Sequence, residues 1–135
     1  MPGLILKLAP NERFVANGVV IENGDRRTRL NILTPGSNVL RLRDAIHPDE
    51  ATTPVTRVCY IVQLVLAGEA DPDEAKPQIA RGIEQLKCVF TDDDCAIKLD
   101  QAASAIAEDK FYPALRALRA LLPAEGHLLA LADPR

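Results

Sequence analysis

The 135-residue chain is 47% hydrophobic and 26% charged, a balance typical of a folded protein and not of a disordered one. Its longest apolar run, residues 58–68, is too short to span a bilayer, and no basic segment marks a signal peptide at the N-terminus. We therefore expect a cytoplasmic protein with reduced cysteines and no membrane partner.

The first third of the chain is predicted to form a small antiparallel sheet or barrel. Segments with alternating apolar residues are separated by turn signals, among them Asn17-Gly18 and Asn23-Gly24. Both residues of an Asn-Gly pair tolerate positive φ, so such pairs are typical of β-hairpins. About five strands are expected, near residues 4–8, 13–17, 19–22, 27–33 and 38–43.

From about Thr53 onward the pattern becomes helical. Thr53 followed by Pro54 is typical of a helix start, and we expect this helix to end near Leu66. A second helix is signalled at Asp71, and Pro77 predicts that it is kinked or begins later. Two more helices are expected over residues 91–110 and 112–122, the last ended by Pro123.

The predicted fold is therefore α+β, with a β module over residues 1–47 and a bundle of three to four helices over residues 53–135.

The charged residues are distributed unevenly between these two parts. Residues 1–43 carry seven Lys or Arg against three Asp or Glu, whereas residues 44–135 carry nine against sixteen. The basic half is a candidate polyanion-binding face, and the acidic half is assigned to dimerisation or partner binding.

Strand alternation groups the basic residues. Arg27 and Arg29 point away from the apolar face that contains Leu30, and Arg41 and Arg43 are expected on the outer face of the fifth strand. Clustered like charges destabilise a sheet unless carboxylates or a polyanion offset them. The spacing alone fits both a solvated edge strand, whose charges block aggregation, and a nucleic-acid face.

Catalytic signatures are absent from the sequence. It contains no GxGxxG, GxxxxGK[ST], GxSxG or HExxH pattern. The three aspartates at 92–94 are better explained by helix capping than by a cation site. We expect no enzymatic activity, no cofactor and no metal.

Two segments, ERFVANGVVIENGDRR (12–27) and FYPALRALRALLPAEGHLL (111–129), resemble the FlbT family, the flagellar biosynthesis repressors of alphaproteobacteria. The resemblance extends over nearly the whole chain in size and in β-then-α order. It implies action after transcription on the 5′ untranslated region of flagellin mRNA, lowering its translation or lifetime, although some members act positively. A second small regulator, FlaF, often works in opposition to the family.

The patterns LIL-KLAP-NE-RFVA-NG at the start and RLNILTPGSNVLRLRDAI at 29–46 are similar to the RNA-binding protein CsrA. On this match Arg43 takes the place of that family's main RNA-contacting arginine. The first strand of CsrA proteins carries further basic residues, where this chain has Leu8 and Ala9. Lys7 is the nearest cation, so the specificity for GGA is not carried over.

These inferences predict a post-transcriptional repressor that binds the flagellin mRNA leader. The expected RNA contacts are Arg43, Arg41, Arg27 and Arg29, supported by Arg26, Arg13 and Lys7. The expected protein partners are a second copy, because a small sheet has open edges, and FlaF or another flagellar protein. The alternative is a protein-binding adaptor or chaperone-like regulator of flagellar assembly, which would act through the helices without contacting RNA.

Overall fold

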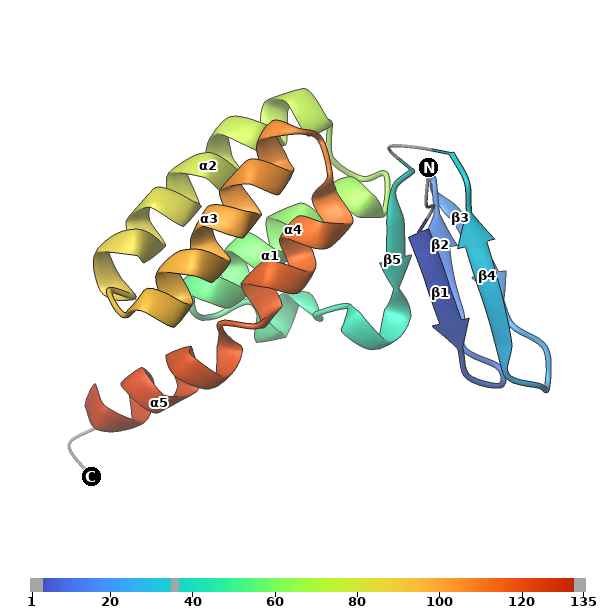
Figure 1. Cartoon of the computed structure of the whole chain (residues 1–135), viewed down its shortest axis with the longest axis horizontal. Helices are drawn as coiled ribbons and strands as arrows, with labels where there is room; N and C mark the ends of the chain where they lie inside the picture. The colour runs from blue at the N-terminus through green and yellow to red at the C-terminus, as the bar shows by residue number, and fades with distance from the viewer. Residues whose placement is uncertain (1–3, 35–36, 133–135) are drawn as a thin grey trace.

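The computed structural model describes residues 4–34 and 37–132 (Figure 1). Within them the strands are β1 (Leu4–Leu8), β2 (Arg13–Ala16), β3 (Val19–Glu22), β4 (Thr28–Ile32) and β5 (Val39–Arg41). Two short 3-10 helices, η1 (Leu42–Asp44) and η2 (Pro48–Glu50), lead to helices α1 (Pro54–Leu66), α2 (Pro72–Val89), α3 (Asp93–Ala107), α4 (Phe111–Arg119) and α5 (Leu122–Ala132). The α+β class with N-terminal antiparallel strands is confirmed.

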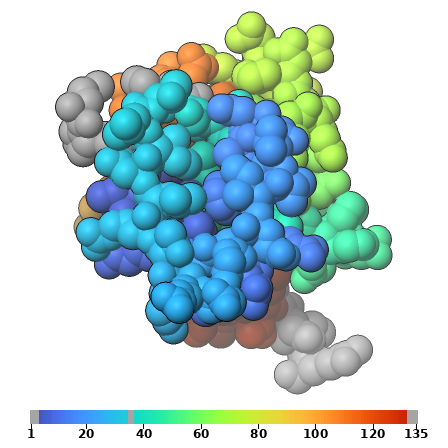
Figure 2. All heavy atoms as spheres, turned by 90° about the vertical axis from the view of Figure 1, so that its right-hand side faces the viewer, coloured from blue at the N-terminus to red at the C-terminus, as the bar shows by residue number. Residues whose placement is uncertain are grey.

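The strands form two small antiparallel sheets that are stacked on each other. One contains β1 and β4, and the other has the order β3-β2-β5. Phe14 and Val39 pack with Leu6 in a cluster between the sheets, whereas Val15 and Leu40 belong to the core of the helical bundle. The three-stranded sheet is therefore the middle layer, and in Figure 2 the strands spread over the face that points away from the helices.

The two Asn-Gly pairs behave differently. Asn17 and Gly18 have φ values of 50° and 83° and join β2 to β3 in the predicted hairpin. Asn23-Gly24 does not make a hairpin, because β4 leaves β3 and pairs with β1 instead. The Asn23 amide donates to the carbonyls of Ala9 and Arg26 at 2.8 and 2.9 Å, which holds the crossing segment in place.

Helices α1 and α2 begin where their capping signals predicted. The Thr53 side chain caps α1, and the Asp71 carboxylate accepts a hydrogen bond from the Asp73 N–H at the start of α2. Pro77 lies inside α2, so of the two alternatives predicted from it, a kinked helix or a later start, the later start is wrong. No helix of the described residues has the length and apolar character needed to cross a membrane.

The sequence reasoning missed α5. The sequence predicts that Pro123 ends a helix, but α4 already ends at Arg119, and Pro123 lies in the first turn of α5, where proline is favoured because the missing N–H would have no partner. Glu125 attaches this helix to the start of α1: its carboxylate accepts hydrogen bonds from the Val55 N–H at 2.8 Å and from the Thr53 hydroxyl. Figure 1 shows the rest of α5 extending away from the bundle.

Candidate functional site

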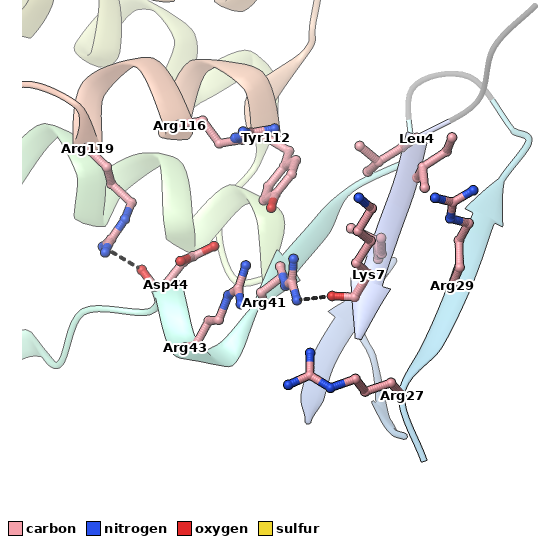
Figure 3. A pocket seen from close by; sticks show the side chains of 12 residues that line it. Leu4, Lys7, Arg27, Arg29, Arg41, Arg43, Asp44, Tyr112, Arg116 and Arg119 are labelled. Carbon is pink, nitrogen blue, oxygen red and sulfur yellow. Dashed lines mark hydrogen bonds between the residues drawn. The ribbon is translucent and has the colours of Figure 1, made fainter. Parts of the chain in front are cut away.

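A groove of about 830 Å³ lies between the strands and α4 (Figure 3). One side is formed by β1 and the beginning of β4, and the other by η1 and α4. Of the twelve described residues that line it, seven are cationic and one, Asp44, is acidic. The cations of this basic groove are Lys7, Arg27, Arg29, Arg41, Arg43, Arg116 and Arg119.

Two of these cations lie directly opposite each other in the β1–β4 ladder. Lys7 is the register partner of Arg29, and both are exposed. Neither forms an ion pair with any carboxylate in residues 4–34 and 37–132. Because like charges across a ladder are destabilising, this pair is a position where a bound anion would relieve repulsion.

Arg41 differs from the others, and the prediction that it points to solvent is wrong. It is 6% exposed, and its guanidinium Nε and Nη2 donate to the two Glu12 oxygens at 2.6 and 2.7 Å. Nη2 also donates to the Lys7 carbonyl at 2.6 Å. The alternation argument failed because β5 is covered on both faces, so all three of its side chains are buried.

The pair formed by Arg41 and Glu12 connects β5 and β2 to β1 at the base of the groove. Hydrogen bonding from Arg41 lowers the pKa of the Glu12 carboxyl from 4.5 to about 2, which outweighs the opposing effect of burial. The same bonds raise the pKa of Arg41. The Arg41 guanidinium is thus already paired and hydrogen-bonded within the protein. Its role in the groove is to position the strands.

Arg43 lies on η1 and not on the fifth strand, which ends at Arg41. Its side chain is exposed and extends into the groove in Figure 3. Leu42, the residue between Arg41 and Arg43, is 40% exposed because the chain turns here. The Arg119 guanidinium donates to the Asp44 carbonyl at 2.9 Å, which attaches η1 to α4.

The remaining predicted site residues divide between the groove and its surroundings. Arg27 immediately precedes β4, and it lines the groove together with Arg29. Arg13 does not line it and instead pairs with Glu22 at 2.8 Å across β2 and β3. Arg26 is exposed in the turn outside the groove. The structure thus brings five of the seven predicted residues to one place, although β4 and β5 belong to different sheets.

The sequence reasoning did not predict the contribution of α4. Tyr112, Arg116 and Arg119 lie on the side of this helix that faces the strands. The sequence signal that could have predicted this contribution is the spacing of Arg116 and Arg119, because residues three apart lie on the same face of a helix. Elsewhere in the described residues, no three His, Cys, Asp or Glu side chains converge as metal ligands would.

Comparison with known proteins places the chain in one family. The model of that family, described as flagellar protein FlbT, matches residues 4–129. The probable flagellum biosynthesis repressor protein FlbT of Mesorhizobium japonicum is 32% identical over 126 residues, which cover 93% of this chain and 84% of the relative. The protein of the same description from Caulobacter sp. strain K31 is also 32% identical, over 93% of this chain and 95% of its own.

The flagellum biosynthesis repressor protein FlbT of Caulobacter vibrioides is 29% identical, over 93% of this chain and 89% of its own. No solved structure matches the chain significantly. The family match covers the strands, the basic groove and all of α4. The chain belongs to the FlbT family.

Proposed function

We propose that this protein regulates flagellin synthesis after transcription. In this proposal it binds the 5′ untranslated region of flagellin mRNA in the basic groove and lowers the translation or stability of that mRNA. The names of its relatives, flagellum biosynthesis repressors, support a regulatory role. The observation that carries the proposal is the exposed Lys7–Arg29 pair, which lies in the groove without a carboxylate partner among the described residues.

Polyanion binding would give such a pair of like charges a role. RNA phosphates would neutralise charges that repel each other in the free protein, and the release of condensed counterions would add to the affinity. Arginine also presents a planar fork that can bind phosphate or a base edge through two hydrogen bonds. We assign direct contacts to Arg43, Arg27, Arg29 and Lys7, and a positioning role to Arg41. Arg13 and Arg26 lie outside the groove and are peripheral.

Binding of the full-length protein to a flagellin leader transcript tests the proposal. Affinity should exceed that for a scrambled RNA of equal length and should fall steeply with salt concentration. Arg43→Ala should reduce the slope of log affinity against log salt by about one. Arg57→Ala is the matched control, because Arg57 is an exposed arginine on α1 outside the groove. Equal affinity for leader and scrambled RNA would refute the proposal.

A second candidate function is that of an adaptor acting on a flagellar protein. The observation that favours it is the apolar surface of α5, where Leu128, Leu129 and Leu131 are 38%, 49% and 70% exposed. An adaptor would retain a flagellar protein on co-purification after Arg43→Ala and lose it after Leu131→Glu. That outcome, together with no preference for the leader RNA, would replace the first function with the second. The homodimer expected from the sequence stays a prediction.

A further inference from the structure

We infer that α4 forms a second wall of the RNA site and that the basic groove takes an unpaired RNA strand, not a duplex. The inference rests on the proposed function. It goes further by naming the form of RNA that binds and by assigning RNA contacts to the helical half. The net negative charge of that half had led to its assignment to dimerisation or partner binding.

The first step is the placement of cations on both sides of the groove. Arg116 is exposed on α4, and Figure 3 shows it on the side opposite Lys7 and Arg29. Arg116 makes no ion pair with the carboxylates of the described residues. A chain of phosphates lying in the groove would therefore meet unpaired positive charge from the strands and from α4.

The second step is that the α4 wall is held firmly. Leu115 and Leu118 of α4 are fully buried in the core, so this helix cannot shift without disturbing the bundle. The hydrogen bond from Arg119 to the Asp44 carbonyl fixes η1, which carries Arg43, against the same helix. Arg43 and Arg116 are thus presented from elements that are connected to each other, and Arg119 acts as a positioning residue.

The third step concerns the form of the ligand. An RNA duplex carries its phosphates on the outside and keeps its bases stacked, with their Watson–Crick edges paired, so it would meet only the rims of a groove with two walls. An unpaired strand can lie inside such a groove, with bases stacked on guanidinium planes. The Tyr112 ring is buried and cannot act as an open stacking platform, but Figure 3 shows its hydroxyl pointing into the groove. Arginine planes must therefore replace aromatic stacking here.

Fluorescence anisotropy with the full-length protein tests both parts of the inference. The probes are an unpaired segment of the flagellin leader, the same segment annealed to its complement, and a scrambled strand. Arg116→Ala should weaken binding of the unpaired segment by about 10-fold, as expected for loss of one hydrogen-bonded charge. Arg116→Lys should restore the salt dependence while recovering the affinity only in part, because lysine lacks the planar fork. Arg57→Ala should change the affinity by less than about 2-fold, since a distant surface charge is screened.

The outcomes separate this inference from the proposed function. If Arg116→Ala binds like wild type while Arg43→Ala is weakened, the α4 wall is refuted and the RNA-binding function stands. If the annealed segment binds as tightly as the unpaired one, the single-strand assignment is refuted. If the wild-type protein binds none of the RNAs, the proposed function fails, and this inference fails with it. Crosslinking of 4-thiouridine in the unpaired segment to an α4 peptide would support the second wall directly.

Discussion

Replacing Glu12 by Gln removes the charge from the ion pair at the base of the groove while keeping the size of the side chain. Glu12 and Arg41 each have side chains that are 8% exposed, and the closest approach is 2.6 Å. A fall in pKa from 4.5 to about 2 corresponds to about 3 kcal/mol of stability by proton linkage at neutral pH. We therefore expect Glu12→Gln to lower the free energy of unfolding by about 2–3 kcal/mol, because the substitution leaves the buried Arg41 guanidinium without its carboxylate.

The sign of the pH dependence follows from the direction of the shift. A carboxyl with a lowered pKa stabilises the folded state fully above its unfolded pKa of 4.5, and this contribution is lost as the pH falls towards about 2. The difference between wild type and Glu12→Gln should therefore be constant from pH 7 down to about pH 5 and shrink by roughly half near pH 3.

Urea unfolding followed by circular dichroism at pH 7, 5, 4 and 3 measures these differences. Glu22→Gln is the matched control, because Glu22 pairs with Arg13 in the same sheet but the two side chains are 53% and 62% exposed. An exposed pair contributes at most about 1 kcal/mol. Equal losses in the two variants, or a Glu12→Gln difference that is the same at pH 3 as at pH 7, would refute the assignment of Arg41 as a buried positioning residue.

Two further predictions concern the helical half. A Cβ at Gly82 would lie 2.6 Å from Cγ2 of Val58, so Gly82→Ala should lower the free energy of unfolding by about 1–3 kcal/mol despite its better helix propensity. At Gly126 a Cβ meets nothing within 4 Å, so Gly126→Ala should instead raise the free energy of unfolding by about 0.5–1 kcal/mol. Urea unfolding measures both variants, and a change of the same sign in the two would contradict the steric argument at Gly82. Burial raises the pKa of Cys59 to about 12 and also raises that of Cys95, whereas Cys88 is exposed. Titration with a thiol reagent at pH 8 should label Cys88 rapidly and the other two only after denaturation, and rapid labelling of two thiols in the native protein would contradict this burial.

The local signals in the sequence were sufficient to locate the strands and helices α1 to α4, although not α5. Asn17-Gly18 predicted a turn because both residues can adopt positive φ, and the structure has them at 50° and 83°. Thr53-Pro54 predicted the start of α1 because a capping oxygen and a preset φ act within one turn of chain. Such preferences depend only on neighbouring residues, so they can be interpreted without knowing the fold.

The pairing of the strands could not be obtained in this way. Asn23-Gly24 carries the same local signal as Asn17-Gly18, yet β4 pairs with β1. This choice depends on Leu30 and Ile32 packing against the cluster that β1 and β2 share, and that cluster exists only once the two sheets are stacked. The contribution of α4 is a similar case, since Arg116 reaches the groove only because the bundle packs against the three-stranded sheet.

Arg41 shows most clearly where sequence reasoning ended. The expectation that it faces solvent rested on strand alternation up to Arg43, but β5 ends at Arg41, and alternation predicts an exposed side chain only when one face of a strand meets solvent. Here the second face of β5 is covered by β1 and β4, and Glu12, 29 residues earlier, supplies the carboxylate that makes burial of the guanidinium tolerable. The sequence therefore identified the arginines that the strands contribute to the basic groove. Which arginine holds the strands together and which are free to bind a ligand depends on long-range packing, which the sequence did not show.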